Sequence, residues 1–114
     1  MKAEDFNQVV KRRLEACTAM LVPKGEEYAR NGDRLHNFKA AGRMKDESPE
    51  QALWGMYAKH LVSVVDMISD AAQGKLPGQK LLDEKISDSI NYHLLLEGLI
   101  TERKMAEPVG EGAE

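Results

Sequence analysis

Apolar residues recur at helical spacing in three stretches of the chain. In the first, from about Lys2 to Leu21, they follow steps of three and four, which describe one face of a helix. The residues of this face are Phe6, Val10, Leu14, Cys17 and Leu21. Pro23 and Gly25 follow, so the pattern argues against a helix that continues through this point.

The second stretch begins with a strong helix-start signal. Ser48 is expected as the N-cap, Pro49 takes the first helical position, and Gln51 stands where a capping box needs it. This helix is predicted to run to about Ala72, because the glycine- and proline-containing segment 73–79 should break it. Its predicted core face consists of Leu53, Tyr57, His60, Leu61, Val64 and Ile68.

The third stretch predicts a helix from about Lys80 to Met105, and one of its faces carries a charge. That face consists of Leu81, Asp88, Tyr92, Leu95 and Leu99, with Glu84 and Asn91 along its edge. A carboxylate facing a core is costly unless it is paired. Asp88 therefore requires a metal ion, a basic partner or a buried hydrogen-bond network.

The rest of the chain adds little regular pattern. Apolar residues are sparse from Asp33 to Glu47, which predicts a loop with one or two helical turns, and no segment alternates as a strand would. We therefore predict an all-α fold without a sheet, a bundle of about four helices with two long antiparallel helices at its centre. It should form a single domain over residues 1–104, followed by a disordered acidic tail over 105–114.

Composition excludes several classes of protein. The 16 basic residues are spread among 19 acidic ones without a basic stripe, which argues against a nucleic-acid partner. The single cysteine excludes an internal disulfide and fits a reducing cytoplasm. No apolar run approaches the ~18–20 residues of a membrane span, so no membrane partner is expected and a cytoplasmic location is predicted.

Carboxylates without a clustered thiolate or imidazole suit a hard cation such as Mg²⁺, which bridges substrate phosphates. Asp66 and Lys59 lie on one side of their predicted helix. They are either a solvated flank or face the last helix, which would create a pocket with both signs of charge. His60 lies on an apolar face, where a satisfied core histidine is commoner than a ligand.

Four short motifs, in this order, resemble a known family: Lys24-Gly-x-x-Tyr28, Asn37-Phe38, Ala58-Lys59-His60 and Asp88-x-x-x-Tyr92. They are similar to small phage-encoded relatives of the MazG-like, all-α nucleoside triphosphate pyrophosphohydrolases, over roughly residues 24–100. The resemblance implies a helical bundle that dimerises or assembles further. It also implies Mg²⁺ held by acidic residues, and cleavage of a nucleoside triphosphate to the monophosphate and pyrophosphate.

The chain departs from the family pattern at two of its acidic positions. Arg30 stands where the third glutamate of EExxE is expected after Glu26-Glu27, and Lys85 stands three residues before Asp88. Glu84 could replace that ligand only by a shift of one residue. Nucleotide binding without turnover is therefore an alternative to hydrolysis.

The first hypothesis is a Mg²⁺-dependent (deoxy)nucleoside triphosphate pyrophosphohydrolase. Its catalytic residues would be Glu27 and Asp88. Its metal ligands would be Glu27, Asp66, Glu84 and Asp88. Its substrate-binding residues would be Lys24, Tyr28, Asn37, Phe38, Lys59, Asn91 and Tyr92.

Two other hypotheses remain open. One is a non-catalytic phage helical module that binds a nucleotide or a host protein, with Asp88 satisfied by Lys59 or by a tyrosine hydroxyl. The other is an oligomeric scaffold with Asp88 at a subunit interface. Both the enzyme and the scaffold would be homo-oligomers, dimers or tetramers.

Overall fold

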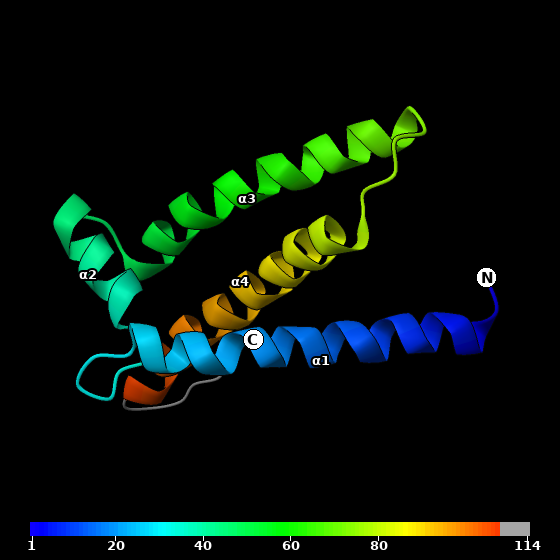
Figure 1. Ribbon diagram of the computed structural model, residues 1–114. Coiled ribbons are helices and arrows are strands. Elements are labelled where there is room, and N and C mark those ends of the chain that lie inside the picture. Colours follow the sequence, from blue (N-terminus) through cyan, green and yellow to red (C-terminus); the bar gives the residue numbers. More distant parts are fainter. Residues whose placement is uncertain (108–114) are drawn as a thin grey trace.

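A computed structural model describes residues 1–107, except the side chain of Tyr28. These residues form four helices (Figure 1): α1 (Ala3–Tyr28), α2 (His36–Lys45), α3 (Pro49–Ala72) and α4 (Gln79–Ala106). No strand occurs among them, and the only bridge in that range joins Arg30 to Asp33. The predicted all-α fold is confirmed. Most of the predicted tail lies outside the described residues, and positions 105 and 106 belong to α4.

Helix α4 is the central element. Both α3 and α1 pack on it, while α2 packs on α3. Segment 73–78 joins α3 to α4, and Figure 1 shows that the two helices lie side by side in opposite directions. The predicted pair of long antiparallel helices is therefore confirmed. None of the helices formed by residues 1–107 is long and apolar enough to cross a membrane.

Helix α3 begins as the sequence predicts. The hydroxyl of Ser48 accepts a hydrogen bond from the backbone N–H of Gln51 at 3.1 Å, and the Gln51 side-chain oxygen accepts one from the Ser48 N–H at 2.8 Å. Each bond satisfies a donor that has no partner within the helix. This capping box fixes the residue at which α3 begins.

Helix α1 corrects one prediction, because it continues through Pro23 to Tyr28. Proline at this position removes the hydrogen bond to the carbonyl of Ala19. Both Ala19 and Pro23 lie on the exposed side of α1, so that carbonyl can bond to water instead. The extra turns carry Lys24 and Gly25 as helical residues.

Helix α2 corrects a second prediction, because it has ten residues where a loop with one or two turns was expected. Its start is held by Asp33, whose carboxylate accepts hydrogen bonds from the Leu35 N–H at 3.0 Å and from Nζ of Lys39 at 2.8 Å. The bond from Lys39, followed by the one from Leu35, holds the pKa of Asp33 below its ordinary value. Phe38, 7% exposed, anchors the helix in the core.

The core lies where α2, α3 and α4 meet. Its buried residues are Phe38, Leu53, Tyr57 and Leu99. The predicted core face of α3 is right at Leu53 and Tyr57, but wrong at Ile68, which is 62% exposed. Figure 1 shows the reason, since α3 diverges from α4 towards its C-terminal end.

A second set of contacts, polar and partly buried, joins α1 to α4. The Arg13 guanidinium donates to the carboxylate of Asp83 and to the hydroxyl of Ser87, both at 2.8 Å. Ser87 is fully buried, and Asn91 donates from Nδ2 to the carbonyl of Cys17 at 3.3 Å. Asn91, expected at the edge of the apolar stripe, is thus covered by α1.

Gly42 offers a test of how α2 packs against the start of α3. A Cβ at this position would lie 2.7 Å from the Glu47 carbonyl oxygen and 3.1 Å from the Ser48 carbonyl group, so backbone would have to move. We expect Gly42→Ala to lower the free energy of unfolding by about 1–3 kcal/mol in urea denaturation.

Gly55→Ala is the matched control, because a Cβ at Gly55 of α3 meets no atom within 4 Å. This variant should be about 0.5–1 kcal/mol more stable, since alanine favours a helix over glycine. Equal effects of the two substitutions would contradict the close approach at Gly42.

Candidate functional site

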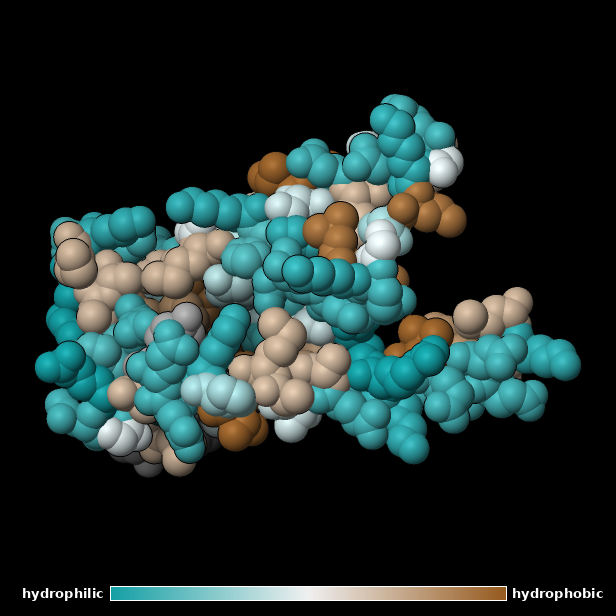
Figure 2. All heavy atoms as spheres, in the orientation of Figure 1, coloured by the Kyte–Doolittle hydropathy of each residue, from teal (hydrophilic) through white to brown (hydrophobic). Residues whose placement is uncertain are grey.

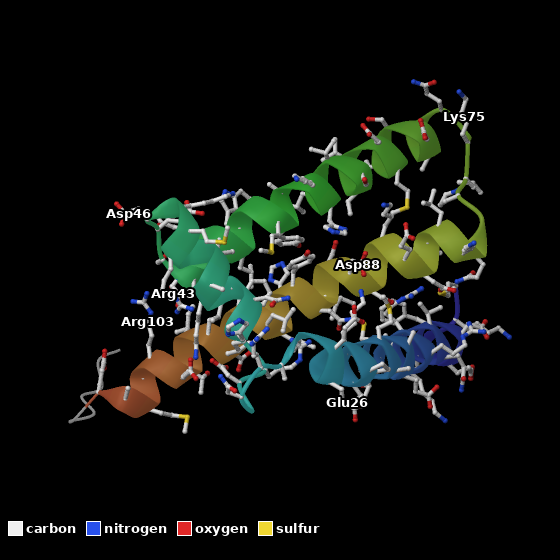
Figure 3. All side chains as sticks on the ribbon, turned by 60° about the vertical axis from the view of Figure 1, so that its left-hand side comes forward. Glu26, Arg43, Asp46, Lys75, Asp88 and Arg103 are labelled. Carbon is white, nitrogen blue, oxygen red and sulfur yellow. The ribbon has the colours of Figure 1, made fainter. Side chains whose placement is uncertain are left out.

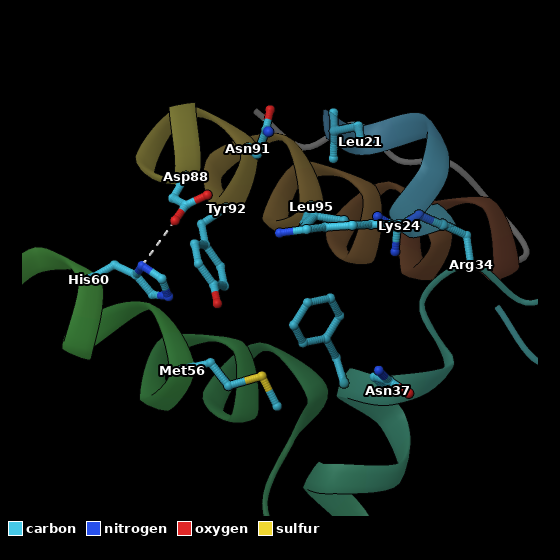
Figure 4. A pocket seen from close by; sticks show the side chains of 11 residues that line it. Leu21, Lys24, Arg34, Asn37, Met56, His60, Asp88, Asn91, Tyr92 and Leu95 are labelled. Atoms are coloured by element: carbon cyan, nitrogen blue, oxygen red, sulfur yellow. Dashed lines mark ion pairs between the residues drawn. The ribbon is translucent and has the colours of Figure 1, made fainter. Parts of the chain in front are cut away.

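A cavity of about 270 Å³ opens where the C-terminal end of α1 meets α2, α3 and α4 (Figure 4). Side chains from all four helices and from the α1–α2 connection line it. The lining residues are Leu21, Lys24, Arg34, Asn37, Phe38, Met56, His60, Asp88, Asn91, Tyr92 and Leu95. Most of this wall is apolar, and its polar groups stand at two ends.

One end of the cavity is cationic. Lys24 reaches it from the last turns of α1, and Arg34 reaches it from the α1–α2 connection. Neither forms an ion pair with a residue in the range 1–107. A Cβ at position 25 would lie 3.0 Å from Nε of Arg34. Because Gly25 has no side chain, the Arg34 guanidinium can lie close to α1. Two cations without acidic partners can bind an anion.

The other end holds a contact between a carboxylate and an imidazole. Oδ2 of Asp88 lies 3.3 Å from Nδ1 of His60 on α3, and the side chains are 14% and 32% exposed (Figure 4). The carboxylate on the apolar face of α4 therefore has a basic partner, which is neither Lys59 nor a tyrosine hydroxyl. His60, expected as an ordinary core histidine, is the residue that satisfies it.

Aromatic rings line the side of the cavity beside this pair. The Tyr92 ring stacks on the ring of Tyr57, with ring centroids 5.0 Å apart. The His60 ring is tilted against the Tyr92 ring, and the centroids of these two rings are 5.1 Å apart. The hydroxyl of Tyr57 lies 3.0 Å from Nε2 of His93, which fixes the stack from behind. These contacts fix the orientation of the Tyr92 ring in the cavity lining.

Asn91 contributes an unusual polar atom. Its side chain is 7% exposed, its Nδ2 donates to the Cys17 carbonyl, and its Oδ1 has no hydrogen-bond partner among the described residues. A buried acceptor without a donor is costly. The residue lines the cavity, but its Oδ1 has almost no accessible surface and is directed away from the other lining side chains (Figure 4).

The cavity brings together six of the residues predicted for the site. These are Lys24, Asn37, Phe38, Asp88, Asn91 and Tyr92. Four others do not line it and are exposed elsewhere: Glu27, Lys59, Asp66 and Glu84. The remaining one, Tyr28, ends α1, and its side chain lies outside the description.

The carboxylates do not assemble into a magnesium site within one chain. Among residues 1–107, Asp88 is the only acidic residue that lines the cavity, and Glu84, with its side chain 55% exposed, pairs with Lys85 at 3.2 Å. Figure 3 shows Glu26 on the outer side of α1, directed away from α4. Residues 1–107 contain no group of three side chains of the kinds that hold metals. Asp88 is thus the only predicted ligand that the described residues place at the cavity, and Mg²⁺ binding stays a prediction.

Sequence reasoning missed two polar members of the cavity, Arg34 and His60. Arg34 lies just before α2, a helix that the sparse apolar pattern does not predict. The sequence therefore offers no reason to place Arg34 beside Lys24. His60 did carry a signal, because it shares the core face of α3 with Tyr57 and one carboxylate was known to need a partner.

A scan against models of protein families finds no match, and neither do searches of the curated proteins and of the solved structures. The relationship to MazG-like enzymes therefore stays a prediction from four short motifs.

The partner of Asp88 can be tested by stability. If His60 is that partner, Asp88→Asn should lower the free energy of unfolding by about 1 kcal/mol. The loss should be the same with and without Mg²⁺, because the contact between Asp88 and His60 needs no metal. In a double-mutant cycle, the loss of unfolding free energy in the variant that combines Asp88→Asn with His60→Asn should be smaller than the sum of the two single losses, by about 0.5–1.5 kcal/mol.

Glu84→Gln is the control, since this exposed carboxylate lies one turn from Asp88. Its effect should stay below about 1 kcal/mol, as is usual for surface pairs. A stabilisation by Mg²⁺ that wild type shows and Asp88→Asn loses would contradict the pairing and support a metal ligand.

Proposed function

We propose that the cavity binds a nucleotide. The observation that carries the proposal is an aromatic wall in one cavity with two cations, Lys24 and Arg34, that have no acidic partner among residues 1–107. Lysine and arginine bind phosphate oxygens, and aromatic rings offer a stacking surface to any base. The phosphates would lie at the cationic end and the base beside Tyr92 and Phe38.

The size of the cavity sets what it can enclose. Its volume of about 270 Å³ falls just below the roughly 300–1,000 Å³ of most ligand pockets. A nucleoside with its first phosphate would occupy it, and further phosphates would extend into solvent past Lys24, which is exposed.

Hydrolysis to the monophosphate and pyrophosphate is the second candidate, as the resemblance to MazG-like enzymes implies. The Asp88–His60 pair favours it, because Nε2 of His60 has no partner among residues 1–107 and could accept a proton. A water would form the new P–O bond, its proton would pass to Nε2, and the bond to the pyrophosphate oxygen would break. Asp88 would stabilise the imidazolium that results.

The alternative is a non-catalytic module, phage-encoded as the resemblance implies, that binds the nucleotide without cleaving it or binds a host protein. Of the four predicted carboxylate ligands, Asp88 alone lines the cavity within residues 1–107, and this supports binding without turnover. Magnesium would then reach the cavity only as the counter-ion of the nucleotide. The proposal retains the predicted homo-oligomer and the cytoplasmic location.

Binding is tested by calorimetric titration with a panel of ribo- and deoxynucleoside mono- and triphosphates, with and without Mg²⁺. Lys24→Ala and Arg34→Ala should each weaken binding about tenfold or more, because each removes a charged hydrogen-bond donor. Lys11→Ala and Arg12→Ala remove exposed cations of α1 that do not line the cavity, and should leave the affinity unchanged.

Turnover is followed in the same samples by release of pyrophosphate. Release that His60→Asn and Asp88→Asn abolish while binding persists would establish the enzyme. Binding without release would establish the module. If no nucleotide binds, or if the four lysine and arginine variants behave alike, the proposal is wrong.

A further inference from the structure

Asp88 has an unused hydrogen-bond acceptor at the end of the cavity opposite the two cations. Its Oδ2 lies 3.3 Å from Nδ1 of His60, whereas Oδ1 has no partner among residues 1–107. Figure 4 shows one carboxylate oxygen facing His60 and the other turned away from it. Asp88 lines the cavity, so a ligand bound there would displace water from this carboxylate. Such a ligand has to supply hydrogen-bond donors in return, because a charge that loses its water is costly unless it is paired.

The Tyr92 ring lies beside the carboxylate. Asp88 and Tyr92 are one helical turn apart on α4, where neighbouring side chains start roughly 5–6 Å from each other. The His60 ring contacts both residues, since its centroid lies 5.1 Å from that of the Tyr92 ring and its Nδ1 faces Asp88. A planar base that packs against Tyr92 would therefore present one edge to Asp88.

The edges of the nucleobases differ in what they offer to a carboxylate. Guanine has two adjacent donors, N1–H and the 2-amino group. Adenine and cytosine place one amino donor beside a ring nitrogen whose lone pair a carboxylate repels, and uracil and thymine have one N–H between two carbonyl oxygens. A carboxylate accepts hydrogen bonds and donates none, so guanine is the base whose edge matches it.

We propose that the nucleotide bound in this cavity is a guanine nucleotide, and that Asp88 determines this specificity. The inference rests on the nucleotide binding proposed above. N1–H and the 2-amino group donate to the Asp88 carboxylate, while the phosphates extend towards Lys24 and Arg34, which Figure 4 shows on the side opposite His60. His60 then lies beside the base and away from the phosphates, so the inference goes with binding without turnover.

Calorimetric titration of the wild-type chain with five ribonucleoside monophosphates tests the inference without a mutation. Guanosine monophosphate should bind about tenfold or more tightly than inosine monophosphate, which lacks only the 2-amino group, because one hydrogen bond to a charged group is lost. Adenosine, cytidine and uridine monophosphates should bind no more tightly than inosine monophosphate. Equal affinities, or tighter binding of any of the other four, overturn the guanine assignment and leave the nucleotide site standing. If neither these nucleotides nor their triphosphates bind, both proposals are wrong.

Asp88→Asn tests the role of the carboxylate by changing the preference. Asparagine presents one acceptor and one donor, which suits xanthine, a base with a carbonyl in place of the 2-amino group of guanine. This variant should bind guanosine monophosphate about tenfold or more weakly than wild type and should prefer xanthosine monophosphate. Damage to the fold alone would weaken both ligands and create no new preference.

Glu84→Gln is the matched control, because this exposed carboxylate lies one turn from Asp88 and outside the cavity lining. It should keep the wild-type preference for guanosine monophosphate. An Asp88→Asn variant that also keeps this preference overturns the proposal. So does pyrophosphate release that His60→Asn abolishes while binding persists, since His60 would then act at the phosphates.

Discussion

The arrangement of this protein depends on satisfying one carboxylate. Asp88 lies on the side of α4 that packs against α3, where an unpaired charge would be costly. His60 of α3 meets it at 3.3 Å, and this contact links the two long helices at a defined register. The same register stacks Tyr57 on Tyr92, so the pair also sets the aromatic wall of the cavity.

The opposite side of α4 is held by polar contacts, and these place the rest of the site. Arg13 of α1 bonds to Asp83 and Ser87, which fixes how α1 lies along α4. Because α1 continues through Pro23, its last turns carry Lys24 to the cavity, and the close approach at Gly25 lets Arg34 join it. The contacts of α4 with α3 and α1 thus place the Asp88–His60 contact at one end of the cavity and, at the other, two cations that form no ion pair within residues 1–107.

The sequence alone predicts features whose causes are local. The start of α3 follows from Ser48 and Gln51, and the singular position of Asp88 follows from helical spacing. The same reasoning fails for α2, because Asp33 and Lys39 stabilise it by contacts that periodicity does not report. It does not bring Glu84 and Asp66 to the cavity, because both are exposed and lie outside its lining, and their role as ligands stays a prediction. Arg34 and His60 enter the site through packing between distant segments.

The central claim is that a nucleotide occupies the cavity between the Asp88–His60 pair and the two cations. Its most direct test is a titration of methyl-labelled methionine protein with a nucleotide, followed by NMR. Met56 lines the cavity, whereas Met44 and Met105 are 87% and 79% exposed far from any lining position. The account predicts that the Met56 signal shifts and saturates while the Met44 and Met105 signals stay in place. A Met56 signal that does not move, or that moves no more than those of Met44 and Met105, would contradict it.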